Sequence, residues 1–134
     1  MSLDEEARRV LGGPLLRFLG ARFDGWVEGT SRVSLTAIAE TLNANDRLHG
    51  GTLCTLLDVT AYLALLPSLD PAQTAVTHNM NVSFFGPSSL GDELLFEAHV
   101  VHRGRTLAFV QSEARVGDKR IATATVCKSL VVLR

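Results

Sequence analysis

Asp58 stands alone in an otherwise apolar run that extends from Leu53 to Leu66. The run is long enough for a helix of roughly four to five turns, and it is apolar on nearly every side. Such a helix belongs at the centre of a protein, where an unpaired carboxylate is costly to desolvate. Asp58 is therefore the foremost candidate for chemistry in this chain. A buried salt bridge or a hydrogen bond to a nearby backbone group is the ordinary alternative.

His49, Gly50 and Gly51 stand immediately before this run. The first amides of a helix have no partner within it, and they lie at the positive end of the helix dipole. The Gly50 N–H therefore suits negative charge that develops on a carbonyl oxygen. The alternatives are that the glycines only permit a tight entry turn and that His49 caps the helix. Taken singly, Asn43 is typical of a turn and Thr77 of a strand.

Gly50 and Asp58 are eight residues apart, which in a helix is roughly 12 Å along the axis and about 80° around it. The Gly50 amide and the Asp58 carboxylate of one chain cannot both touch the same reacting carbon. If both take part, one protomer supplies Gly50 and its partner supplies Asp58. This geometry predicts a homodimer.

The elements that would hold these residues follow from hydrophobic periodicity and turn residues. Residues 1–20 form a helical segment that the Gly12-Gly13 pair interrupts. Residues 21–28 and 31–37 are short strands, residues 41–48 form a loop, and residues 50–66 form the central helix. Four longer strands are expected at 74–85, 92–103, 105–116 and 119–133. Gly117-Asp118 is the turn of the last hairpin.

Strands segregated from one apolar helix indicate an α+β architecture. The simplest arrangement wraps a curved antiparallel sheet of five or six strands around the long buried helix. A second copy of the chain would then close the exposed side of the helix.

The 134 residues are expected to form one domain, 1–134, with 46% hydrophobic and 20% charged residues. A net charge of −1 argues against binding to nucleic acid or to an anionic membrane surface. The apolar run is interrupted by Asp58 and ends at Pro67, so it is expected to be too short and too polar to span a membrane. The N-terminus lacks the pattern of a signal peptide, and Cys54 and Cys127 lack metal-ligand spacing. These features predict a cytoplasmic protein with reduced core cysteines and no metal site.

The ordered motif Asn43-x5-His49-Gly50-Gly51-x6-Asp58 resembles the signature of the hotdog-fold acyl-CoA thioesterases. The nearest branch is the phenylacetic-acid-degradation and human thioesterase-superfamily-member type, related to one type of 4-hydroxybenzoyl-CoA thioesterase. The similarity continues in residues 76–84, in the Gly86-Pro87 loop, in residues 103–109 and in residues 121–124. It covers about residues 30 to 132.

This resemblance implies hydrolysis of an aryl- or medium-chain acyl-CoA by a homodimer that pairs into a homotetramer. Asp58 would act as general base or nucleophile, and the Gly50 N–H would polarise the thioester carbonyl. Asn43 and His49 would assist, and Thr77 would help to place the attacking water. A thioester is already activated, so neither a metal nor another cofactor is expected. Replacing Asp58 by Asn or Ala is expected to abolish most turnover while the fold stays intact.

Seven further residues are candidates for contacts with the substrate or with coenzyme A. Basic residues at or near strand ends could bind its phosphates, although solvated surface charges are the ordinary alternative. Two glycines could allow the pantetheine arm to pass, and Tyr62 could line the acyl pocket or simply pack. The complete set is Gly51, Tyr62, Gly86, Arg103, Gly104, Arg105 and Lys128.

Two other functions remain open at this point. A hotdog hydratase or dehydratase would use His49 and Asp58 as a base and acid pair on an acyl thioester. A non-catalytic acyl-CoA-binding module would keep the fold without turnover. Release of free thiol distinguishes hydrolysis from both.

Overall fold

The N-terminal segment forms two helices in a computed structural model that describes residues 1–133. Helix α1 spans Leu3–Leu11 and α2 spans Pro14–Leu19, so the break at Gly12-Gly13 is confirmed. The Ser2 side chain caps α1 by accepting a hydrogen bond from the Glu5 amide at 3.1 Å. Pro14 begins α2, where its missing N–H removes no helical hydrogen bond.

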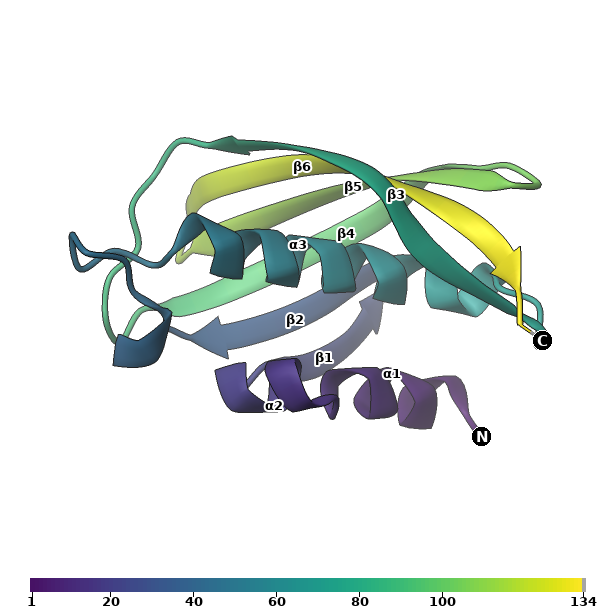
Figure 1. The fold of residues 1–134 in the computed structure, drawn as a ribbon, viewed down its shortest axis with the longest axis horizontal. Coiled ribbons are helices and arrows are strands. Elements are labelled where there is room, and N and C mark those ends of the chain that lie inside the picture. The colour runs from purple at the N-terminus through teal and green to yellow at the C-terminus, as the bar shows by residue number, and fades with distance from the viewer. Residues whose placement is uncertain (134) are drawn as a thin grey trace.

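Six antiparallel strands form one sheet in the order β1-β2-β4-β5-β6-β3. The sheet curves around the central helix α3 (Figure 1), and the predicted hotdog architecture is confirmed. The strands are β1 Arg22–Val27, β2 Thr30–Thr36, β3 Gln73–Phe84, β4 Glu93–Arg103, β5 Leu107–Val116 and β6 Lys119–Val132. Strand β5 begins two residues later than expected because Gly104 to Thr106 form a turn, which the Gly104 amide closes on the Leu107 carbonyl at 2.8 Å.

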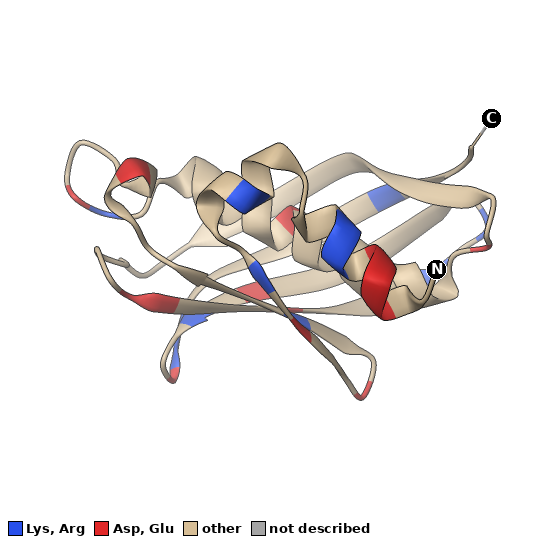
Figure 2. Ribbon diagram, turned by 90° about the horizontal axis from the view of Figure 1, so that it is seen from below, with Lys and Arg blue, Asp and Glu red and all other residues tan. Residues whose placement is uncertain are grey.

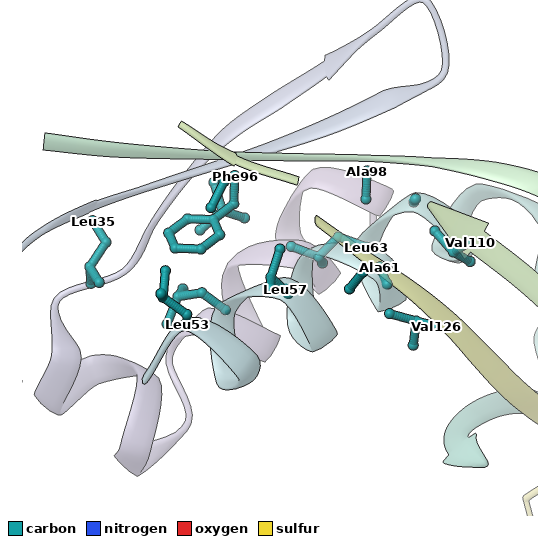
Figure 3. Packing of buried hydrophobic residues seen from close by; sticks show 14 of the residues in the cluster. Leu35, Leu53, Leu57, Ala61, Leu63, Phe96, Ala98, Val110 and Val126 are labelled. Atoms are coloured by element: carbon teal, nitrogen blue, oxygen red, sulfur yellow. The ribbon is translucent and has the colours of Figure 1, made fainter. Parts of the chain in front are cut away.

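Helix α3 spans Gly50–Leu65 and continues as a short 3-10 turn, Leu66–Ser68. A second 3-10 turn, Ala39–Thr41, lies in the loop before it. Leu53, Leu57 and Ala61 point from the helix toward the inner face of the sheet (Figure 3). There they meet side chains that are fully or almost fully buried, including Phe96, Ala98, Val110 and Val126. The alternation predicted for residues 92–103 is confirmed, since Leu94, Phe96 and Ala98 face inward.

The apolar character of α3 follows from this packing. Taken with the 3-10 turn, the segment Gly50–Ser68 has 19 residues and is predominantly apolar. By length and composition it could cross a membrane, so the expectation that it is too short and too polar is wrong. Half of the segment is buried inside the fold, which is the environment that accounts for its apolar side chains. Basic and acidic residues are interspersed along the chain (Figure 2).

A β-bulge interrupts β3 where it passes the middle of α3. Thr77 is opposite Lys128 on β6, and Asn79 is opposite Cys127, so His78 is the extra residue. The extra residue lets both Thr77, before the bulge, and Met80, after it, face the helix side of the sheet. The bulge therefore determines which side chains of β3 meet α3.

Candidate active site

The Asp58 carboxylate lies in a compact cluster with Thr77 and Lys128. Its Oδ1 atom accepts hydrogen bonds from the Thr77 hydroxyl at 2.6 Å and from the Lys128 ammonium at 2.8 Å. The ammonium also donates to the Thr77 oxygen at 2.9 Å. The three polar groups therefore form a closed triangle. The salt bridge that sequence considerations offered as the ordinary explanation of Asp58 is present.

The position of Lys128 follows from the alternation of β6. Ala122, Ala124 and Val126 are buried on the inner face of the sheet, and Lys128 is next in the same series. It pairs with Ala108 on one side and with Thr77 on the other. The Lys128 side chain is only 4% exposed. The sequence suggested that Lys128 is a surface ligand for phosphate, but its ammonium is buried and committed to Asp58.

The second oxygen of Asp58 remains available. Within residues 1–133, no group donates a hydrogen bond to Oδ2, and the side chain is 33% exposed. Asp58 borders a hollow of about 460 Å³ between α2 and α3. Apolar atoms of Leu15, Leu16 and Val59 contribute to its walls. One carboxylate oxygen is thus fixed by the protein, and the other is free to act on a ligand.

The start of α3 presents one unused amide. The Gly51 amide donates to the His49 Nδ1 at 3.0 Å, so His49 caps the helix and occupies the Gly51 N–H. No acceptor for the Gly50 amide occurs in the described part of the chain. A Cβ atom at Gly50 would lie an ordinary 3.6 Å from the Phe84 ring. The packing among the described residues therefore does not require glycine here.

Asn43 organises the loop before α3. Its side-chain oxygen accepts from the amides of Asn45 at 2.9 Å and Arg47 at 3.2 Å. The turn role considered from the sequence is therefore present. The side-chain nitrogen of Asn43 makes no hydrogen bond within the described residues and could still meet a substrate oxygen.

The remaining candidates differ in how the fold engages them. Arg103 donates to the carbonyls of Gly104 and Ser68 and to the Gln73 side chain, at 3.0 to 3.2 Å, so it ties strand ends together. Arg105 is exposed in the adjoining turn. Its role as a phosphate ligand stays a prediction.

Tyr62 lies one turn beyond Asp58 on α3. Its ring centroid is 5.9 Å from the Lys128 ammonium, and its hydroxyl is 3.4 Å from the Thr74 hydroxyl. The ring borders a second hollow of about 500 Å³ beside the N-terminus of α1. Tyr62 therefore packs against the cluster and lines a cavity.

Gly86 and Gly104 are explained by contacts within the chain. A Cβ atom at Gly86 would lie 2.8 Å from the Ile121 side chain, and one at Gly104 would lie 2.9 Å from the Leu107 carbonyl. Both distances are too short for a larger residue without movement. Contact with the pantetheine arm is not needed to explain either glycine.

Cys54 lies one turn before Asp58 on α3. Burial raises the pKa of this thiol above its usual value, and the negative charge of Asp58 raises it further. Cys54 is therefore a neutral thiol near pH 7. No group of His, Cys, Asp and Glu side chains within residues 1–133 could hold a metal ion.

The fold thus joins Asp58 and Thr77 directly and keeps Gly50 at the start of the same uninterrupted helix. Lys128 is the member of the cluster that sequence considerations misplaced. Its even spacing from Ala122, Ala124 and Val126 was the available signal for an inward position.

Comparison with known proteins identifies the family. Residues 45–123, more than half of the chain, match the family described as the thioesterase superfamily. The chain belongs to this superfamily and has the hotdog fold, as its sheet and central helix also indicate. Acyl-coenzyme A thioesterase 13 from Homo sapiens is 39% identical over 70 residues, which are 52% of this chain and 49% of that protein. The chain thus spans about half the length of the curated relatives that it matches.

Solved structures match over more of the chain. A thioesterase family protein from Silicibacter pomeroyi has a TM-score of 0.88 and 26% identity, covering 98% of this chain and 99% of its own. The PaaI protein of the E. coli phenylacetic acid degradation operon has a TM-score of 0.80 and 25% identity, covering 95% and 92%. A Streptococcus mutans protein bound to acetyl CoA has a TM-score of 0.76 and 26% identity, covering 85% and 90%.

Proposed function

We propose that this chain is an acyl-CoA thioesterase that hydrolyses an aryl- or medium-chain acyl-CoA. The observation that carries the proposal is the asymmetry of Asp58: Lys128 and Thr77 bind one carboxylate oxygen, the other accepts no hydrogen bond within residues 1–133, and the residue borders a largely apolar hollow. Membership of the thioesterase superfamily and the likeness to a protein bound to acetyl CoA support the same reaction class.

In this mechanism the Asp58 Oδ2 atom removes a proton from a water molecule, and the water oxygen attacks the thioester carbonyl carbon. The carbon–sulfur bond then breaks, giving the free acid and the thiolate of coenzyme A, which takes up a proton. Direct attack by Oδ2 on the carbonyl carbon, with later hydrolysis of the anhydride, uses the same geometry. The Thr77 hydroxyl already donates its hydrogen bond to Asp58. Thr77 therefore orients the carboxylate directly and acts on the attacking water only through it.

The carbonyl oxygen of the thioester would accept a hydrogen bond from the Gly50 N–H of a second protomer. Helix α3 is continuous from Gly50 to Leu65, so roughly 12 Å of helix rise separates Gly50 from Asp58 of the same chain. We therefore propose a homodimer whose sites each combine Asp58 of one protomer with Gly50 of the other. Two such dimers would form the tetramer.

A thiol-release assay over aryl and aliphatic acyl-CoAs tests this function. Wild-type protein is expected to release thiol from some members of the panel, and the Asp58→Asn variant is expected to lose about a thousandfold or more of kcat. Normal turnover by that variant would remove Asp58 from the mechanism. Binding without thiol release would indicate a binding module. Loss of enoyl-CoA absorbance without thiol would indicate a hydratase, although the capping role of His49 gives that reaction little support.

A further inference from the structure

Lys128 carries a buried positive charge that the hydrolytic mechanism above does not use. Its side chain is 4% exposed, and its ammonium contacts two acceptors, the Asp58 Oδ1 atom at 2.8 Å and the Thr77 oxygen at 2.9 Å. An ammonium removed from water keeps its charge at an acceptable cost only where such acceptors replace the lost hydration. Both acceptors are candidates for the reaction.

We infer that Lys128 is a positioning residue: it fixes Asp58 Oδ1 so that Oδ2 points at the substrate. A carboxylate on a helix can rotate about its side-chain bonds, and one hydrogen bond leaves part of that freedom. Two donors from neighbouring strands, the Thr77 hydroxyl and the Lys128 ammonium, hold Oδ1 from β3 and β6 together. Rotation then requires both contacts to break.

The β-bulge at His78 supports this inference because it places Thr77 directly opposite Lys128. Bulges re-aim side chains beside functional sites. The Tyr62 ring, 5.9 Å from the ammonium, adds a further favourable contact on the same side. This arrangement assigns Lys128 to the reacting carboxylate and not to the phosphates of coenzyme A. The inference rests on the proposed thioesterase function.

The Lys128→Met variant tests the inference, because methionine fills a similar volume without charge or donors. We expect kcat to fall about a hundredfold, the usual penalty for a misplaced catalytic group, while KM and the melting temperature stay near the wild-type values. Lys119→Met is the matched control, since Lys119 is an exposed lysine on the same strand. It removes the same charge and should leave turnover unchanged.

Other outcomes overturn the inference in distinct ways. A raised KM with unchanged kcat would assign Lys128 to phosphate binding. A fall in melting temperature with normal kcat for the folded protein would show a purely structural ion pair. In an Asp58→Asn background, Lys128→Met should lower kcat no further, because the carboxylate that it positions is gone. An additive loss there would contradict positioning through Asp58.

A measurement without turnover separates this inference from the proposed function. With ¹⁵N-labelled lysine, the Lys128 ammonium should give a slowly exchanging NMR signal that both Asp58→Asn and Thr77→Val shift. If wild-type protein released no thiol, the thioesterase proposal would fail. If neither substitution changed the chemical shift of the Lys128 ammonium, the positioning role would be wrong even in an active enzyme.

Discussion

At the scale of single residues, contacts within the chain explain only part of what is seen at Gly50 and Asp58. The chain itself supplies no steric reason for glycine at position 50, whereas it supplies one at Gly86 through Ile121. Among residues 1–133, Thr77 and Lys128 donate to Asp58, but to only one of its two oxygens. In both cases the unexplained part is what points to a ligand.

Gly50→Ala is expected to lower kcat/KM by about ten- to a thousandfold. The added methyl group would hinder the approach of the thioester carbonyl oxygen to the N–H of residue 50. The free energy of unfolding should stay the same or rise by up to about 1 kcal/mol, since alanine favours a helix. Steady-state kinetics and urea unfolding measure the two effects. Gly86→Ala is the matched control, with about 1–3 kcal/mol of destabilisation from overpacking against Ile121. Equal loss of stability in both variants would contradict the assignment of Gly50.

The Lys128 ion pair changes the expectation that Asp58 variants keep an intact fold. Asp58→Asn would leave a buried ammonium without its counter-charge, and we expect a loss of roughly 2 kcal/mol, less than for a fully buried pair because Asp58 is one-third exposed. The Asp58→Asn/Lys128→Met double variant should recover this loss. Chemical denaturation of the single and double variants measures it. A double variant less stable than Asp58→Asn would show that Lys128 stabilises the fold by itself.

At the scale of elements, the start of α3 combines a structural and a chemical position. His49 caps the helix through Nδ1 and so occupies the Gly51 amide, whereas the Gly50 amide has no acceptor within residues 1–133. The capping contact and the proposed contact with the substrate therefore involve adjacent amides, and a substitution at His49 changes both unless the cap is preserved.

His49→Asn and His49→Ala separate the two roles of this residue. Asparagine is a good cap, so His49→Asn should keep the wild-type free energy of unfolding, whereas His49→Ala should lose about 1 kcal/mol. If the imidazole also contacts the substrate, both variants lose turnover to a similar extent. If His49 only caps, His49→Asn keeps normal turnover. Thermal unfolding and thiol release on the same samples distinguish these results.

At the scale of the whole molecule, the distance between Gly50 and Asp58 along one rigid helix is the decisive feature. A site that uses both requires two chains, and the exposed edge strand β3 lies beside the Asp58 cluster. The hollow next to Asp58 is lined by α2, by its N-cap Gly13 and by α3. A second protomer would complete it.

Subunit mixing tests the composite site. Asp58→Asn and Gly50→Ala protomers, each defective alone, are unfolded and refolded together in equal amounts. In a mixed dimer one site carries both substitutions and the other carries neither, so the mixture should regain about one quarter of wild-type activity. Activity no higher than the mean of the two parent proteins would show that each site belongs to one chain.

The order of the helices and strands, the broken N-terminal helix and the buried helix predicted at residues 50–66 can be read from local sequence patterns. These features depend on local periodicity and on turn residues such as Gly12-Gly13 and Gly117-Asp118, which act within a few positions of the chain. The ordered Asn43, His49, Gly50 and Asp58 motif also identified the family before any contact was known. The spacing of Lys128 from Val126 indicates that its side chain points inward, but no local pattern indicates that its partner is Asp58.

The contacts of Asp58, by contrast, depend on long-range packing. The bulge at His78 brings Thr77 opposite Lys128, and both contact Asp58, which is 19 and 70 residues away from them in sequence. Such a contact depends on the register between β3 and β6, two paired strands that no short turn joins. The same packing lets Arg103 donate to the Gly104 carbonyl, places Gly86 against the Ile121 side chain and gives one oxygen of Asp58 a hydrogen bond from Lys128. Local sequence patterns do not distinguish the candidate residues that have partners within the chain from those that could contact a substrate. Long-range packing makes that distinction.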